Sequence, residues 1–142
     1  NAIPHIDDFS NDGYTKEEMK MINETKKILD KSIDVTATCV RVPVLVSHAE
    51  SLNIEFEKEF TLEKVINLLE NADGCKVVND QRDGGYMTQL EAAGKDETFI
   101  SRIRKDNTNE KAINLWIVSD NLLRGAALNA VEIAEAYIKT KQ

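Results

Sequence analysis

Cysteine and histidine are scarce in this sequence, and neither is arranged as a metal or disulfide site. The 142 residues contain two cysteines and two histidines. Cys39 and Cys75 are too few for a disulfide framework and lack the close spacing of a zinc knuckle. His5, Asp7 and Asp8 lie close together but match no known ligand pattern. We therefore predict no metal site, and we expect the reducing environment of the cytoplasm.

Long hydrophobic runs and blocks of basic residues are also missing. The longest apolar stretches are the size of single strands, far short of the ~20 residues that span a bilayer, and no signal peptide or lipidation motif is visible. No cluster of Lys and Arg is interleaved with aromatic residues. The net charge is −7, and 30% of the residues are charged, with both signs present. We expect neither a membrane nor a nucleic-acid partner.

The length of the chain is enough for one folded domain over residues 1–142, because a chain of this size can bury a hydrophobic core. The first residue is Asn1, and the residues that follow it, Ala2-Ile3-Pro4-His5-Ile6, are already largely apolar. A domain usually begins with a polar lead-in. We therefore expect the domain to be incomplete at its N-terminal end and the chain to be a fragment.

Local patterns predict an alternation of helices and strands. Thr15-Lys16-Glu17-Glu18 is a capping box, which predicts a helix from there to about residue 30. Two further helices are predicted after Thr61 and over about residues 122–141. Runs rich in β-branched residues, or alternating in polarity, predict strands over residues 33–46 (interrupted at Pro43), 52–57, 75–78, 99–104 and 112–119, with a polar loop over about 83–97. This order predicts an α+β fold with a mixed, largely antiparallel sheet covered by helices.

Arg41 and His48 are the most informative candidates for chemistry. An arginine can hold a carboxylate with two parallel hydrogen bonds, and a histidine carries protons near neutral pH. Each also has an ordinary structural interpretation, as a sheet-edge or ion-paired arginine and as a hydrogen-bonded histidine. Seven positions separate them, so in one regular strand their side chains would point to opposite faces. They can converge only if the chain bends between them, and Pro43 is the expected place.

Glu17 and Lys20 are three positions apart on the first predicted helix, so they lie on the same face. The ordinary interpretation is an exposed ion pair. Met21 and Ile28 lie beside this charged face, which favours a face that lines a pocket.

The sequence as a whole resembles the C-terminal domain of the aspartate-semialdehyde dehydrogenases. The similarity extends over essentially the whole chain in the correct order, so it is highly specific. The segments that carry it are Asn1-Ala2-Ile3-Pro4-His5-Ile6-Asp7, Gly13-Tyr14-Thr15-Lys16-Glu17-Glu18-Met19-Lys20, Asn23-Glu24-Thr25-Lys26-Lys27-Ile28, Val35-Thr36-Ala37-Thr38-Cys39-Val40-Arg41-Val42-Pro43-Val44 with His48, Phe99-Ile100-Ser101-Arg102-Ile103-Arg104 and Trp116-Ile117-Val118-Ser119-Asp120-Asn121-Leu122-Leu123-Arg124-Gly125-Ala126-Ala127.

This resemblance implies a catalytic and dimerisation domain, similar in fold to the C-terminal domain of glyceraldehyde-3-phosphate dehydrogenase. The family uses NADPH to convert β-aspartyl phosphate to aspartate β-semialdehyde, a step toward lysine, methionine and threonine. By position in the family motifs, His48 corresponds to the acid/base and Arg41 to the arginine that binds the substrate α-carboxylate. Glu17 corresponds to the residue that holds the substrate amino group and Lys20 to a phosphate-site lysine. Asn121 corresponds to an amide near the nicotinamide.

One part of the family pattern is missing from this chain. The nucleophilic cysteine and the glycine-rich NADP loop of the family precede residue 1, and Cys39 and Cys75 do not occupy the position of the nucleophile. We therefore expect the chain to be inactive alone, and to act as a homodimer together with an N-terminal nucleotide-binding domain. The apolar stripe of the last helix is expected to pack on that domain. A non-catalytic dimerisation module and a small-acid-binding domain are the alternatives.

Overall fold

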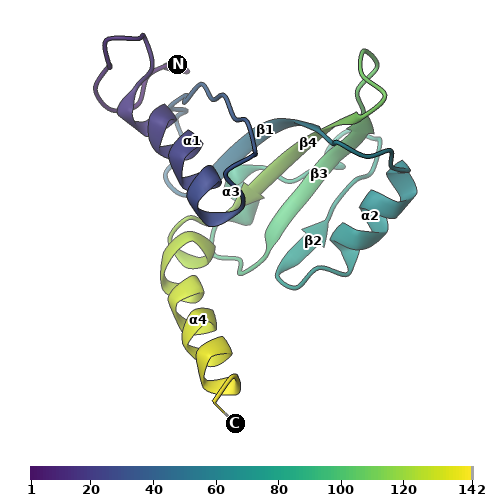
Figure 1. The fold of residues 1–142 in the computed structure, drawn as a ribbon. Coiled ribbons are helices and arrows are strands. Elements are labelled where there is room, and N and C mark those ends of the chain that lie inside the picture. Colours follow the sequence, from purple (N-terminus) through teal and green to yellow (C-terminus); the bar gives the residue numbers. More distant parts are fainter. Residues whose placement is uncertain (142) are drawn as a thin grey trace. The chain divides into compact units, whose positions relative to one another are not determined.

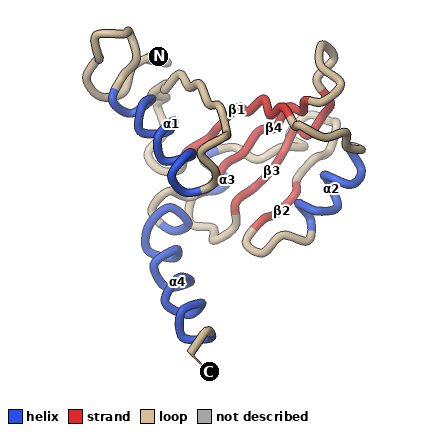
Figure 2. Tube along the Cα trace, in the orientation of Figure 1, coloured by secondary structure: helices blue, strands red, loops and turns tan. Residues whose placement is uncertain are grey.

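A computed structural model describes residues 1–141 and divides them into two compact units, Asn1–Pro43 and the residues from Val44 onward (Figures 1 and 2). The first unit contains a single helix. The second contains a four-stranded sheet with its helices. The elements, in order, are α1 (Lys16–Ile28), β1 (His48–Glu55), α2 (Leu62–Glu70), β2 (Cys75–Val77), α3 (Gln89–Ala92), β3 (Thr98–Lys105), β4 (Ala112–Ser119), the π-helix η1 (Leu123–Ala127) and α4 (Leu128–Lys139).

Helix α1 begins as the capping box predicts. The Thr15 hydroxyl accepts a hydrogen bond from the backbone N–H of Glu18, and the Glu18 carboxylate accepts one from the backbone N–H of Thr15. Two of the unpaired N–H groups at the helix start are satisfied in this way. The helix ends at Ile28, close to the predicted boundary.

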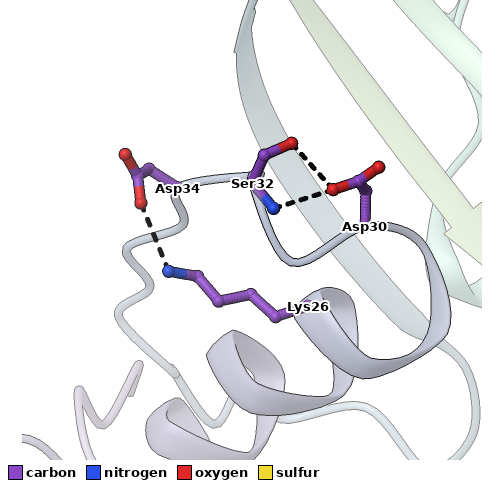
Figure 3. Close-up of polar contacts among 4 residues, drawn as sticks. All are labelled: Lys26, Asp30, Ser32 and Asp34. Carbon is purple, nitrogen blue, oxygen red and sulfur yellow. Dashed lines mark hydrogen bonds and ion pairs between the residues drawn. The ribbon is translucent and has the colours of Figure 1, made fainter.

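The turn after α1 is fixed by short-range polar contacts (Figure 3). Asp30 accepts hydrogen bonds from the backbone N–H and the hydroxyl of Ser32, at 2.8 and 2.7 Å, and these bonds lower the pKa of Asp30. Lys26, in the last turn of α1, forms an ion pair with Asp34 at 3.2 Å. The chain therefore leaves the helix in a defined direction.

The strand predicted over residues 33–46 is wrong. The segment is extended but belongs to no sheet, and Figure 2 shows it as loop. Its single ladder contact is an isolated bridge between Ile3 and Arg41, whose backbone N–H and C=O groups exchange two bonds of 2.8 Å. β-Branched residues fit a pleated surface but need a neighbouring strand, and Pro43 has no N–H to give to one.

The sheet of the second unit is mixed and largely antiparallel, as predicted. Its strand order is β1-β4-β3-β2; β4 pairs antiparallel with β1 and β3, and β2 pairs parallel with β3. Strand β1 starts at His48, four residues before the predicted start at Leu52. The extra residues are paired with the end of β4, a long-range contact that local alternation does not reveal.

Two hydrophobic clusters hold α2 and α3 to the sheet. The larger one is centred on buried Ile100, Ile103, Ile113 and Leu115, and the apolar face of α2 packs against it. Figure 1 shows α2 beside β2 and β3. The smaller one consists of Ala92 of α3, Phe99 and Val118, with partly buried neighbours including Trp116.

The last predicted helix is in fact two connected helices. A π-helical segment, η1, precedes α4, and α4 extends away from the sheet (Figure 1). Arg124 anchors η1, since its Nε donates to the Asp96 carbonyl at 2.8 Å and its guanidinium pairs with Glu132. The side chains of Ile133 and Tyr137 are each 61% exposed, so the apolar stripe of α4 is uncovered in this chain.

Within residues 1–141, none of the helices combines the length and the apolar character that a membrane crossing requires.

Asp106 organises the turn between β3 and β4. Its carboxylate accepts from the Thr108 hydroxyl at 2.7 Å, the Thr108 N–H at 2.8 Å and the Asn53 side-chain amide at 2.6 Å. These donors, the Thr108 hydroxyl first, lower the pKa of Asp106 from 3.8 to about 2. A lowered pKa means that the native state favours the charged carboxylate.

We predict that Asp106→Asn lowers the stability of the protein at neutral pH and that this loss disappears in acid. The contribution of the carboxylate is complete above pH 3.8, its ordinary pKa, and is lost as the pH falls toward about 2. Urea midpoints of both proteins at several pH values measure this effect. A difference between them that stays constant down to about pH 2 would contradict it.

Candidate functional site

The five residues predicted for the site are divided between the two units. Glu17, Lys20 and Arg41 belong to the first unit, and His48 and Asn121 belong to the second. In each unit, separate hydrogen bonds fix the backbone near these residues.

Glu17 and Lys20 share one face of α1, as their spacing predicts. Lys20 Nζ lies 3.5 Å from Glu17 Oε1, and the two side chains are 56% and 33% exposed. The pair is therefore loose and accessible. An incoming ammonium group and an incoming anion could each replace one partner at little cost, because exposed ion pairs contribute at most about 1 kcal/mol.

Glu18 holds the segment that carries Arg41 against α1. The Glu18 residue is 6% exposed, and besides the Thr15 N–H its carboxylate accepts from the backbone N–H of Cys39 at 2.8 Å. The two backbone donors, Thr15 first, lower the pKa of Glu18. Cys39 lies two positions before Arg41, and the bridge to Ile3 fixes the backbone of Arg41 itself. The exposed guanidinium of Arg41 is therefore attached to a backbone whose position is fixed.

In the second unit, His48 is the first residue of β1 and lies opposite Ser119, the last residue of β4. The His48 side chain is exposed at this end of the sheet. Among the described residues, no hydrogen bond or ion pair involves the imidazole. Both ring nitrogens are thus available for proton transfer with a ligand.

Ser47 and Asn121 fix the backbone that leads into His48. Ser47 adopts a left-handed conformation with φ 79°, which is uncommon for a residue with a side chain. Its backbone N–H donates to Asn121 Oδ1 at 2.8 Å, across 74 positions of sequence. The Ser47 residue is 4% exposed, and its hydroxyl has no partner within residues 1–141. Asn121 therefore connects the end of β4 to the start of β1.

Asp120 fixes the backbone next to Asn121. Its carboxylate accepts from the N–H groups of Gly94 at 2.7 Å and Leu122 at 2.8 Å, with a longer bond from Leu123. These donors, Gly94 first, lower the pKa of the buried Asp120 side chain. The carboxylate thereby joins the loop after α3 to the start of η1.

Neither cysteine is positioned as a nucleophile. Cys39 is buried, and its Sγ lies 3.5 Å from Met21 Sδ. Cys75 packs against the larger hydrophobic cluster. Over residues 1–141, no group of three or more His, Cys, Asp or Glu side chains is arranged to hold a metal ion.

The sequence reasoning missed three residues of this framework: Glu18, Ser47 and Asp120. The capping box identifies Glu18 as a helix-start residue but gives no sign of its bond to Cys39. Asp120 precedes a helical segment, which is a recognisable capping signal. No local pattern identifies the conformation of Ser47.

The chain is similar to known proteins over most of its length. The family described as semialdehyde dehydrogenase, dimerisation domain, matches residues 1–124, so the chain belongs to this family. The chain is 49% identical to the aspartate-semialdehyde dehydrogenase of Aquifex aeolicus over 140 residues, and 51% identical to that of Helicobacter pylori strain 26695 over 139 residues. Each alignment covers 98% of this chain, and the chain spans 41% and 40% of the two relatives.

A solved structure is similar as well. Aspartate semialdehyde dehydrogenase II from Vibrio cholerae, complexed with ASA, superposes with a TM-score of 0.91 at 46% identity. The match covers 98% of this chain and 41% of that chain. The α+β fold predicted from the sequence is therefore confirmed.

We predict that Glu18→Gln destabilises the protein by several degrees of melting temperature. A glutamine offers one acceptor oxygen, so its NH2 group would face one of the two N–H groups that the carboxylate now accepts from. Glu24→Gln, at an exposed position of the same helix, is the matched control and should leave the melting temperature unchanged. Thermal unfolding followed by circular dichroism measures both. Equal melting temperatures for the two variants would contradict the role of Glu18.

Proposed function

We propose that this chain is the substrate-binding and acid/base part of an NADP-dependent aspartate-semialdehyde dehydrogenase. The reaction is the reductive dephosphorylation of β-aspartyl phosphate to aspartate β-semialdehyde. The observation that carries the proposal is the match of 98% of the chain, at 49–51% identity, to relatives that bear this name. The chain spans about two fifths of those relatives. The nucleotide-binding domain and the nucleophilic thiol therefore belong to the remainder of the protein, and residues 1–142 alone are inactive.

The residues of the first unit bind the charged groups of the substrate. Arg41 takes the α-carboxylate, because its exposed guanidinium offers a bidentate donor pair. Glu17 takes the α-ammonium group and Lys20 the phosphate. Bound substrate thus replaces the loose contact between Glu17 and Lys20 with two shorter charge-assisted ones.

His48 transfers the protons of the reaction. Its imidazole takes the proton of the nucleophilic thiol, so that the thiolate can attack the acyl phosphate and expel phosphate as a thioester forms. NADPH, when bound, supplies the hydride that reduces this thioester. His48 then gives its proton to the oxygen on which negative charge develops, and takes it back as the carbon–sulfur bond breaks, which releases the aldehyde and restores the thiolate. One residue therefore serves both steps, and the fixed backbone at Ser47 and Asn121 holds it in place.

Asn121 has the chemistry to contact the nicotinamide group of NADP. Its amide oxygen is used by the Ser47 N–H, while no bond from its NH2 group is present among residues 1–141. That NH2 group is a donor suited to a carboxamide oxygen. Asn121 thus serves the cofactor with one end of its amide and the His48 segment with the other.

The assembly is a homodimer in the cytoplasm. The description of the family as a dimerisation domain supports the dimer. The uncovered apolar residues of α4, including Val131, Ile133 and Tyr137, pack against the nucleotide-binding domain of the same protein, since such a stripe is costly in water. Residues 1–142 act as one functional domain, from the substrate site to this helix.

We predict that His48→Ala in the full-length enzyme lowers kcat by about 10²–10⁴-fold, because a general acid/base contributes about that much. KM should change little, since the imidazole binds no charged group of the substrate. His5→Ala is the matched control, because the only other histidine of this chain stacks on Phe9 in the first unit. The assay is phosphate- and NADP-dependent oxidation of aspartate semialdehyde. Near-normal turnover by His48→Ala would instead favour a non-catalytic dimerisation module.

We predict that Arg41→Lys raises KM for aspartate semialdehyde by at least about tenfold, because a lysine cannot form the bidentate pair. Arg82→Lys is the control, since Arg82 is exposed and pairs with Asp80. Steady-state kinetics of the full-length enzyme separate KM from kcat. An unchanged KM would show that Arg41 does not bind the substrate. Substrate binding without any turnover would favour a small-acid-binding domain.

A further inference from the structure

Helix α4 is attached to the rest of the second unit by few contacts. Figure 1 shows it extending away from the sheet, and none of its residues is buried. Within α4, only Leu128 at its start and Glu132 one turn later are partly buried. Among residues 1–141, η1 is the only element with which α4 makes more than isolated contacts. The direction of α4 therefore depends on its junction with η1 and on Glu132.

The junction itself gives α4 little support. η1 is a π-helical turn, in which the backbone N–H of Ala127 donates to the Leu122 carbonyl at 3.1 Å. Turns of this kind are rare in proteins and are often found at functional sites. Gly125, Ala126 and Ala127 are exposed and have small side chains or none. These residues therefore contribute little packing that could fix the direction of the helix that follows.

Arg124 provides this support. Its Nε donates to the carbonyl of Asp96, in the loop before β3, at 2.8 Å, and its Nη1 forms an ion pair with Glu132 of α4. The Arg124 side chain is only 22% exposed. One residue of η1 is thus bonded both to the loop before β3 and to α4. A guanidinium can form such contacts together because its donors lie in a rigid planar fork.

Gly74 forms the surface against which this guanidinium lies. Gly74 has a left-handed backbone with φ 74°, and its carbonyl accepts from the backbone N–H of Thr98 at 2.8 Å, which ties the turn to β3. A Cβ added to Gly74 would lie 2.7 Å from Arg124 Nη1, well inside the ~3.5 Å at which non-bonded atoms attract best. The close approach of the arginine therefore requires a glycine at this position.

A cavity lies between this turn and α4, beside the guanidinium. It has a volume of about 300 Å³ and is lined by Asp73 and Gly74 of the turn, by Arg124, and by residues of α4 that include Glu132 and Ala136. Because the cavity occupies the space between the turn and the helix, the Arg124 side chain is what connects them there.

We propose that Arg124 is a positioning residue of the dehydrogenase, which sets the direction of α4 and thereby the place of the nucleotide-binding domain. This proposal rests on the proposed function, in which α4 packs against that domain and Asn121 contacts the nicotinamide group. Asn121 lies three positions before Arg124, so one short segment holds both the nicotinamide contact and the start of the helix. A change in the direction of α4 moves the nicotinamide relative to His48, and a misplacement of ~1 Å can slow a reaction by about 10²-fold.

The test compares variants of the full-length enzyme at Arg124 and Gly74. Arg124→Gln removes the ion pair with Glu132, and Gly74→Ala displaces the guanidinium with its added Cβ. We expect each to lower kcat by at least about tenfold, while KM for aspartate semialdehyde stays within about twofold because the substrate residues of the first unit are unchanged. Calorimetry should show that NADP binding weakens by about fivefold, the effect of one lost hydrogen bond. A purely structural role would lower the melting temperature and leave kcat and NADP affinity unchanged.

Two controls are matched to these variants. Gly84 has a φ of 72°, and a Cβ added there meets no described residue within 4 Å, so Gly84→Ala introduces the same backbone strain without the contact. Arg82→Gln removes the same charge from an exposed ion pair. Both controls should keep kcat and NADP affinity within about twofold of the wild type. Circular dichroism verifies that all variants are folded.

The double variant tests whether Gly74 acts through Arg124. Gly74→Ala with Arg124→Gln should be no slower than Arg124→Gln alone, because the contact is already lost, and losses that add would overturn this link. Equal kcat and NADP affinity for Gly74→Ala and Gly84→Ala, or a wild-type kcat for Arg124→Gln, overturns the proposal while leaving the proposed function intact. A wild-type enzyme that does not oxidise aspartate semialdehyde with NADP and phosphate overturns both.

Discussion

The pairing of β1 with β4 is the constraint on which the second unit depends. Eight consecutive residue pairs join these strands, from His48 opposite Ser119 to Glu55 opposite Ala112. This ladder brings together positions that are 71 residues apart at His48 and Ser119 and 57 apart at Glu55 and Ala112. The bond between Ser47 and Asn121 extends it by one further contact. Because the catalytic candidate His48 is the first residue of β1, its position follows from this pairing and not from the sequence around it.

Two carboxylates, those of Glu18 and Asp120, also join segments that are distant in the sequence, because each accepts hydrogen bonds from backbone N–H groups. Glu18 joins the start of α1 to Cys39, and Asp120 joins Gly94 to the start of η1. Both are buried, and in both cases the donors lower the pKa, so the charged form is the native one. The candidates Arg41, which is exposed, and Asn121, which is partly buried, each lie within two positions of a backbone N–H held in this way, so the backbone at both is fixed.

The sequence predicts the parts of the fold that local interactions decide. The capping box at Thr15 locates α1, and the residues of β4 are predicted to the position. Segments decided by distant partners are predicted poorly: residues 33–46 have strand propensity but no strand beside them, and the first residues of β1 are set by β4. The candidate residues come from resemblance to a family, whereas the residues that support them, Glu18 and Ser47, become visible only in three dimensions. The bulge of β3 at Arg102, where the pairing with β4 shifts register, likewise has no local signal, since no glycine is present there.

The proposal that most needs a test is that Arg41 and His48 both serve the substrate of the full-length enzyme. A crystal structure of the full-length enzyme with bound aspartate β-semialdehyde tests this claim most directly. We expect the Arg41 guanidinium to bind the α-carboxylate of the ligand through two hydrogen bonds, and the His48 imidazole to lie within hydrogen-bonding distance of its aldehyde oxygen. A ligand bound in a position where Arg41 and His48 both point away from it would contradict the account.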